Sequence, residues 1–435
     1  NRFARECCGW RRSRAMQAVA ASLGAASDMA EQSLTPIGPW SGINNVLEPH
    51  APPFQPGGES IPALVSARNV DINDHGWPRS RKFLLDEVLV PGALGLWSVA
   101  GRLFWQGGAT LYERRTGDVP VLAGLMRRVS IAEHWGRLYV TDGVNHFEID
   151  GEEVRNWGLP VPALSSLAQT SGDLYAPGRY AVRAAFVDAR GNEGGVSPPS
   201  EIVLTGGIEA QPARIGGISL TVSGASAAVV GVNLYVSEAD QPTESFADYF
   251  DIGDPVEVTG LSTVSDPPRT DRMRGPIAGA DGIFSFRAFL LMWRGAVVFR
   301  SEAAEPHLFD AVNLMQFPAP VVAAEGVETG MWIATERGLW WVSGESPESW
   351  VPSRKLDSTF YPGSICLPGS RFPRLQTGGQ VVLFASDRGL VAGLPSGDAV
   401  ELTAKTYHFT PGSRFDFCYV ERDNLSQLLV NVWQP

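Results

Sequence analysis

The sequence predicts an all-β protein whose main part is a β-propeller-like body. A phrase made of a tight glycine turn followed by apolar or aromatic residues recurs at Gly101, Gly136, Gly295, Gly338 and Gly389. Three of the intervals between successive copies are 35, 43 and 51 residues, close to the roughly 40–50 residues of a four-stranded propeller blade. The content of 47 glycines and 32 prolines, with 10% aromatic residues, is also typical of a turn-rich β protein.

The copies at Gly136 and Gly295 are 159 residues apart, so this gap holds either three further blades or one insertion. Residues 170–275 read as short alternating strands with turns every ten or so residues, which predicts a small β-sandwich. The pattern from Tyr180 to Asp188, the segment 193–200 and the segment 232–237 resemble a fibronectin type III module. That resemblance implies that Tyr235 packs into the core of the sandwich.

These patterns divide the chain into five parts. We expect a basic, Ala-rich segment that is not necessarily native, an extended Pro-rich arm with a first strand, propeller blades, an inserted fibronectin-III-like sandwich and the remaining blades. Their ranges are 1–28, 29–92, 93–163, 164–278 and 279–435. A strand near the C-terminus, residues 428–433, is expected to complete the first blade and close the ring, since closure removes exposed strand edges.

The first 28 residues differ from the rest, because they carry five arginines against two acidic residues, a net charge of +3. Three interpretations remain open for them. They are residues upstream of a natural start at Met29, a short native helical arm, or a signal peptide with a weakly apolar middle. The prolines that follow, in the range 36–62, keep that stretch extended, and such arms wrap their own body or a neighbouring subunit.

Charge and cysteine content exclude several classes of protein. The formal net charge is −12, so residues 29–435 carry −15, and an acidic body lacks the Lys and Arg that supply tight DNA binding. No apolar run reaches the length of about 18 residues that a membrane span needs. The four cysteines form no CxxC pair, which argues against a zinc site and favours folding in a reducing compartment.

The opening of the chain carries a family resemblance. Gly38-Pro-Trp-Ser-Gly-Ile-Asn-Asn45, then Ala67-Arg-Asn-Val-Asp-Ile72 and Gly76-Trp-Pro-Arg-Ser-Arg81 resemble the start of the tail nozzle proteins of short-tailed phages (the tail tubular protein B and tail accessory family). The directly similar region covers about 45 residues. It implies assembly contacts by Gly42, Asn44, Asn45, Arg68, Asn69, Trp77, Arg79 and Arg81.

The same resemblance implies a structural virion protein rather than an enzyme. Copies would form a homo-oligomeric ring, six-fold in this family, that extends the DNA-exit channel below the portal and adaptor proteins. Tail fibre or tail needle proteins would lie beside or below it, DNA would pass without specific binding, and assembly in the host cytoplasm would place the protein in the virion tail. A weakly attractive or acidic channel would not hold the DNA.

No motif of known catalytic chemistry is present, and we predict no catalytic residues, no cofactor and no metal. The motifs Gly-x-Ser-x-Gly, Gly-x-x-x-x-Gly-Lys-Ser/Thr and His-Glu-x-x-His are absent. His134 and His146 flank one predicted hairpin and are interpreted as structural. Two alternatives remain: a carbohydrate-binding propeller adhesin or receptor-binding protein that uses exposed Trp and Tyr, and a propeller glycoside hydrolase or lyase with paired carboxylates.

Overall fold

The structure of the chain is a computed structural model that describes residues 70–72, 78–80, 93–170, 177–205, 217–258, 266–268, 272–368, 379–405, 407–409, 414–422 and 425–433. The chain divides into two compact units, Asn1–Gly42 with Pro52–Arg81, and Ile43–Ala51 with Lys82–Pro435. In the first unit, β1 (Val70–Ile72) pairs antiparallel with β2 (Pro78–Ser80). The predicted Ala-rich segment and most of the predicted extended arm lie outside the described residues.

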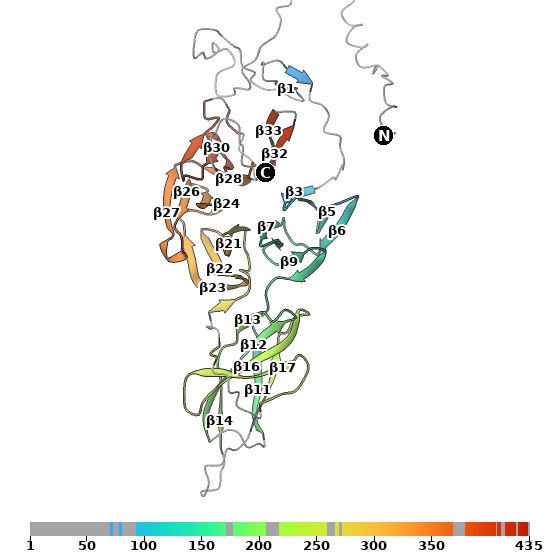
Figure 1. The fold of residues 1–435 in the computed structure, drawn as a ribbon, viewed down its shortest axis with the longest axis vertical. Helices are drawn as coiled ribbons and strands as arrows, with labels where there is room; N and C mark the ends of the chain where they lie inside the picture. Colours follow the sequence, from blue (N-terminus) through green and yellow to red (C-terminus); the bar gives the residue numbers. More distant parts are fainter. Residues whose placement is uncertain are drawn as a thin grey trace, which may run out of the picture. The chain divides into compact units, whose positions relative to one another are not determined.

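Among its described residues, the second unit contains five antiparallel sheets built on a four-stranded meander, which we call blades 1 to 5, and the sheet of blade 3 has a fifth strand, β19 (Met273–Arg274) (Figure 1). Blade 1 consists of β3 (Ala93–Val99), β4 (Arg102–Gly107), β5 (Thr110–Arg114) and β6 (Asp118–Ala123), and blade 2 of β7 (Ser130–His134), β8 (Arg137–Thr141), β9 (His146–Asp150) and β10 (Glu153–Asn156). Blade 3 consists of β20 (Gly282–Phe286), β21 (Phe289–Arg294), β22 (Val297–Glu302) and β23 (Glu305–Gln316). Blade 4 consists of β24 (Val321–Val327), β25 (Gly330–Thr335), β26 (Gly338–Ser343) and β27 (Val351–Leu356), and blade 5 of β28 (Phe360–Cys366), β29 (Val382–Ser386), β30 (Gly389–Gly393) and β31 (Ala399–Glu401).

A sixth sheet follows the five blades and has two strands among the described residues, β32 (Arg414–Arg422) and β33 (Leu425–Trp433). The predicted C-terminal strand is therefore present, but β33 pairs with β32 and not with the first blade. The expectation that this strand completes blade 1 is wrong, because the hairpin from 414 to 433 keeps its hydrogen bonds within its own sheet.

The first strands of successive sheets lie next to one another. In this way β3 contacts β7, β7 contacts β20, β20 contacts β24, β24 contacts β28, and β28 contacts β32. Sheets arranged around their first strands in this manner define a β-propeller-like body. The prediction of an all-β, propeller-like body is thus confirmed.

Side chains of each blade alternate between the two neighbouring sheets, as the two-residue period of a strand requires. In β8, Leu138 and Val140 belong to a buried core shared with blade 1, whereas Tyr139 between them belongs to a core shared with blade 3. In β25, Met331 packs toward blade 3 and Trp332 toward blade 5. The core of the body is therefore divided into layers between neighbouring blades.

The recurring glycine turns are present but do not occupy one place in the blade. Gly101 and Gly136 lie in the first hairpin of blades 1 and 2, whereas Gly295, Gly338 and Gly389 lie at the second hairpin of blades 3, 4 and 5. The turn pairs Ala100–Gly101 and Trp135–Gly136 have positive φ at both positions. This is the mirror-image turn that matches the twist of a two-residue hairpin. The intervals of 35, 43 and 51 residues each join equivalent hairpins of successive blades and so measure one blade, whereas the interval from Gly136 to Gly295 runs from a first hairpin to a second one.

The insertion between blades 2 and 3 is a β-sandwich, which confirms that part of the fold prediction. One sheet has the order β11 (Ala163–Thr170), β15 (Gly217–Ser223), β18 (Val256–Val258), and the other has β13 (Glu193–Val196), β12 (Gly178–Asp188), β16 (Val229–Ser237), β17 (Glu244–Asp251), with β14 (Ser200–Leu204) also paired to β12. A buried core of aliphatic and aromatic residues fills the space between the sheets. Two sheets around one core are the architecture that fibronectin type III modules share.

Two details of the sandwich differ from the sequence prediction. Tyr235 is buried but packs with Ala185 and Phe246 in a small cluster apart from the main core, which takes its neighbours Leu234 and Val236. The cause is strand alternation, which turns Tyr235 to the opposite face of its sheet. The short strand β19 (Met273–Arg274), inside the range assigned to the sandwich, pairs with β23 of blade 3.

Candidate functional site

The residues predicted to make assembly contacts lie at the start of the chain. Gly42, Asn44, Asn45, Arg68, Asn69, Trp77 and Arg81 lie outside the described residues. Arg79 belongs to β2, where its backbone is paired with Asp71 of β1. The β1–β2 pairing therefore brings the backbone of Val70–Ile72 beside that of Pro78–Ser80.

A cavity of ≈ 600 Å³ lies where blade 2, blade 3 and the sandwich meet. The largest group of lining residues belongs to blade 2. Others come from the 188–192 turn and the 227–230 segment of the sandwich, and further ones from the β22–β23 connection of blade 3. The polar and aromatic lining residues are His134, Trp135, Arg137, Tyr139, Glu148, Glu153, Arg155, Asn156, Asp188, Arg190, Asn192 and His307. We call this space the blade–sandwich cavity.

Ion pairs fix one wall of the blade–sandwich cavity. Arg190 of the sandwich donates to Glu148 of blade 2 at 2.5 Å and to Asp150 at 3.2 Å. Arg137, on the neighbouring strand, lies 3.3 Å from each of the same two carboxylates. Glu148 is largely buried, so its charge needs this compensation. The pairs therefore join the insertion to blade 2 across the cavity.

The turn that carries Arg190 is itself held by hydrogen bonds. Asp188 Oδ1 accepts from the backbone N–H groups of Arg190 and Asn192, at 2.8 and 2.9 Å, and Asp188 Oδ2 accepts from the Asn192 amide at 2.9 Å. This is the local side-chain-to-backbone bonding by which aspartate stabilises turns. Nearby, His307 Nε2 lies 3.1 Å from the backbone oxygen of Glu193, which adds a contact between blade 3 and the sandwich.

Aromatic rings form another part of the lining. The Trp135 side chain is 57% exposed, and its ring is stacked on the His134 imidazole with 4.5 Å between centroids. Tyr139 meets His134 and Trp157 edge to face, an arrangement that aromatic pairs favour. Trp135 thus presents a large apolar surface at a polar cavity while one side of its ring is supported.

Burial changes the ionisation of two cavity residues. It lowers the pKa of His134 to about 4, so the imidazole is neutral at pH 7. Burial, with the nearby charge of Glu148, raises the pKa of Tyr139 to about 12. His134 Nδ1 is hydrogen-bonded to Ser285 Oγ at 2.8 Å, and within the described part of the chain its Nε2 has no hydrogen-bond partner.

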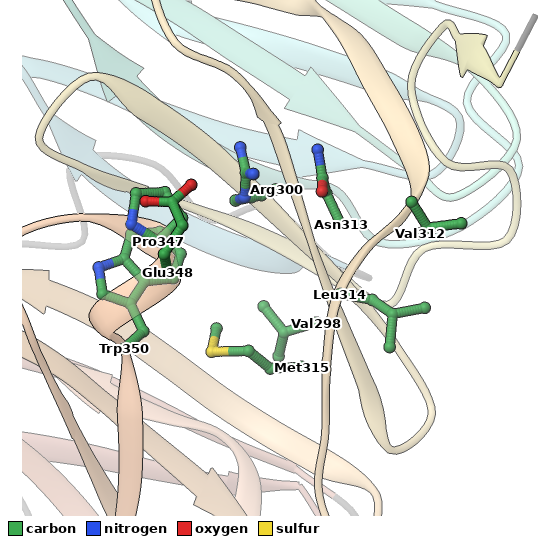
Figure 2. A pocket seen from close by; sticks show the side chains of 9 residues that line it. All are labelled: Val298, Arg300, Val312, Asn313, Leu314, Met315, Pro347, Glu348 and Trp350. Carbon is green, nitrogen blue, oxygen red and sulfur yellow. The ribbon is translucent and has the colours of Figure 1, made fainter.

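A second, smaller cavity of ≈ 210 Å³ lies on blades 3 and 4. Figure 2 shows Pro347, Glu348 and Trp350, from the connection between β26 and β27, on one side, and Val312 and Leu314 of β23 on the other side, pointing away from them. Val298 and Met315 lie between them, and Arg300 and Asn313 are the remaining polar side chains. We call this space the β23 groove. Its lining is mainly apolar, which suits contact with another polypeptide more than chemistry.

Sequence reasoning named none of the blade–sandwich cavity as a binding site. It predicted the glycine turn at Gly136, which is present and holds Trp135, and the second turn, 188–192, joins β12 to β13. The sequence did not show that these two turns line the same cavity, because the residues around each turn carry no pattern that depends on the other turn. A signal was present in the turn itself, since the corresponding position in blade 1 is occupied by Ala100.

Neither cavity holds a group of residues with metal-ligand geometry: within the ranges described above, no three His, Cys, Asp or Glu side chains gather to hold a metal ion. In the same ranges, no helix has both the length and the apolar character of a membrane span. The arrangement of the blade–sandwich cavity offers hydrogen-bond donors, acceptors and an aromatic surface, which are the means of non-covalent recognition.

No protein-family model and no curated protein sequence matches this chain. Among solved structures, similarity is found to the extracellular domain of the one-component system BT4673 from B. thetaiotaomicron (TM-score 0.30, 9% identity, 78% of this chain and 37% of that chain). Apo AztD from Citrobacter koseri is similar with a TM-score of 0.29 and 10% identity over 73% of each chain. A puromycin hydrolase mutant has a TM-score of 0.20 and 11% identity over 78% and 58%. The chain therefore spans about a third of the first of these, and its own strand pairing defines the fold.

Proposed function

We propose that this chain is a structural subunit of a phage tail, a nozzle protein whose copies form a ring around the DNA-exit channel. The resemblance of residues 38–81 to tail nozzle proteins is one support. The propeller-like body with an inserted sandwich is the architecture which that resemblance led us to expect. In this role the protein meets the portal and adaptor above, and tail fibre or needle proteins beside or below.

The observation that carries the proposal is an open strand edge on blade 3. β23 pairs with β22 on one side, while β19 covers only Phe309 and Asp310 on the other. Beyond them, within the described residues, the outer edge of 311–316 has no strand partner. Val312 and Leu314 on this segment are 56% and 45% exposed. Open apolar edges are sites of strand pairing or association between chains.

The other four blades protect their outer strands in the usual way. Each of these strands carries a charged residue, a proline or both: Asp118 and Pro120 in β6, Glu153 and Arg155 in β10, Pro352 and Arg354 in β27, and Glu401 in β31. Such residues discourage edge-to-edge association. β23 carries such residues in its first half (Glu305, Pro306 and Asp310), but its segment 311–316, with the sequence Ala-Val-Asn-Leu-Met-Gln, has neither. It is therefore the blade edge best suited to a neighbouring copy.

A ring needs two different complementary surfaces on each copy, since head-to-tail contacts close a cycle. The open edge and the adjoining β23 groove share Val312 and Leu314 and together form one of these two surfaces (Figure 2). The acidic balance of the chain, with a net charge of −12, suits a channel that releases DNA instead of binding it. The six-fold symmetry of the ring is an expectation from the resemblance.

Cryo-electron microscopy of the full chain mixed with the portal–adaptor complex of its phage tests this function. We expect a coaxial ring with a lumen wide enough for a DNA duplex and with β23 at the contact between copies. A chain that stays monomeric in the presence of that complex contradicts the proposal. A ring in which β23 faces solvent retains the nozzle function and rejects the assigned contact.

A further inference from the structure

The ring contact proposed at residues 311–316 does not use the blade–sandwich cavity. The side chains that line this cavity indicate the kind of ligand that would fit it. We propose that this cavity binds a neutral carbohydrate. The proposal is independent of the nozzle function, because every residue it uses belongs to one copy of the chain.

The charged side chains of the cavity balance one another. Three arginines (Arg137, Arg155, Arg190) and three carboxylates (Glu148, Glu153, Asp188) line the cavity, so their formal charges cancel. The arginines are already paired: Arg137 and Arg190 with Glu148, and Arg155 with Glu153. An anionic ligand would have to displace these pairs. A neutral polyhydroxylated ligand needs no displacement, because its hydroxyls donate to the carboxylates and accept from the guanidinium groups.

The second step is the aromatic surface at Trp135. A sugar ring has an apolar face of C–H groups with a slight positive charge, which matches the negative face of an indole. The Trp135 ring is stacked on His134 at 4.5 Å and remains 57% exposed. Among the described residues it is the only tryptophan in the class of exposed large hydrophobic side chains. Its surface therefore serves a ligand and not the core of the protein.

Backbone geometry gives a third step. Trp135 has a φ of 51°, a conformation that is uncommon for bulky residues. The equivalent turns carry Ala100 in blade 1 and Arg287 in blade 3, with φ values of 51° and 54°. The two-residue hairpin itself requires this conformation. The turn thus places the indole at the cavity as part of the hairpin geometry.

An unused hydrogen-bonding atom gives the fourth step. His134 lines the cavity and is 98% buried, since its exposed fraction is 2%. Its Nδ1 is bonded to Ser285, whereas its Nε2 has no hydrogen-bond partner among the described residues. Buried polar atoms without a partner are rare, and a bound ligand is one way to satisfy them. This nitrogen is itself buried beneath the cavity surface, so a sugar hydroxyl pairs with it only when the neighbouring side chains move.

Saturation-transfer NMR with the full chain tests the proposal. The probes are the methyl glycosides of glucose, galactose, mannose and N-acetylglucosamine and short oligomers of each, with glucuronic acid and inorganic phosphate as anionic probes. We expect saturation transfer to at least one neutral sugar. Trp135→Ala should weaken that binding about tenfold, the factor that corresponds to ~1.4 kcal/mol, whereas Trp135→Phe should keep it within about threefold.

The site is located by incorporating fluorotryptophan and following its fluorine signals. The chain has 13 tryptophans, and the signal lost in Trp135→Phe identifies Trp135. We expect this signal to shift on addition of the sugar, also in the control variant Val144→Ala, whose exposed side chain lies outside the cavity. No neutral sugar bound at about 10 mM, binding of the anionic probes alone, or equal binding by Trp135→Ala would each overturn the proposal.

Discussion

Arg128 and Asp416 are 288 positions apart in the sequence, and their side chains form an ion pair of 2.7 Å. Arg128 precedes blade 2, and Asp416 belongs to the sixth sheet. The Arg128 guanidinium also donates to the backbone oxygen of Leu94 and lies over the Trp97 ring of blade 1. One side chain therefore joins the beginning of the propeller-like body to its end.

Loss of this ion pair should destabilise the body. Burial lowers the pKa of Arg128 to about 10, so the group stays charged at pH 7 and needs its carboxylate. We expect Asp416→Asn to reduce the free energy of unfolding by ~1–3 kcal/mol, measured by urea denaturation. The matched control is Asp357→Asn, because Asp357 also pairs with an arginine but its side chain is 81% exposed. Equal effects of the two variants would contradict the role of Arg128 in joining the ends.

Glu325 should make the protein less stable as the pH rises. It lies on β24, the first strand of blade 4, and burial raises its pKa to about 7 against the weaker opposite effect of the Gly326 N–H. The folded state then binds a proton that the unfolded state has released between pH 4.5 and 7, so stability falls through that range. Glu325→Gln should be more stable than the parent at pH 8, by about 1–3 kcal/mol. Urea denaturation at pH 4 and pH 8 checks this, since the two proteins should converge at pH 4.

Glu113 should show the opposite dependence on pH. Its hydrogen bond with Arg102, opposed by burial and assisted by Arg115, lowers its pKa to about 2. This contribution to stability is complete above pH 4.5 and is lost as the pH falls toward 2. Glu113→Gln should therefore cost ~1–3 kcal/mol at pH 7 and little at pH 2. The same denaturation series applied to this variant gives the test, and a cost independent of pH would reject it.

Assembly should depend on the open edge of β23. Val312→Lys places a charge on this edge and should prevent ring formation without changing the thermal midpoint of the single copy. Val144→Lys is the matched control, because Val144 is 55% exposed and Val312 is 56% exposed. Light scattering after size exclusion measures the mass of each variant. Rings formed by Val312→Lys as readily as by the control would remove β23 from the contact.

The sequence was sufficient to predict the kind of fold but not the order of strands within it. Turns such as Trp135–Gly136 and the one that ends at Gly389 are visible in the sequence because each places a glycine at positive φ. The same requirement applies to every hairpin of a blade, so the glycine cannot tell the first hairpin from the second. The sequence pattern of 428–433 predicts a strand but not its partner, which is the preceding strand β32.

The cavity between blade 2, blade 3 and the sandwich could not be predicted for a related reason. Its two walls at Trp135 and Arg190 are both turns in the sequence, and each turn has a complete local explanation. Their proximity follows from where the sandwich meets blade 2, through the pairing of Arg190 with Glu148. Contacts of this kind are determined by tertiary structure, and a single sequence holds no record of them.

The pairing of Arg128 with Asp416 also sets an order of events during protein synthesis. At about 5–20 residues per second, a ribosome needs ~15–60 s to travel from one of these codons to the other. The whole sandwich is translated in that interval, and its two sheets already enclose a core of their own. The sandwich can therefore finish folding before Asp416, the ion-pair partner of Arg128, has been synthesised. The propeller-like body is completed last.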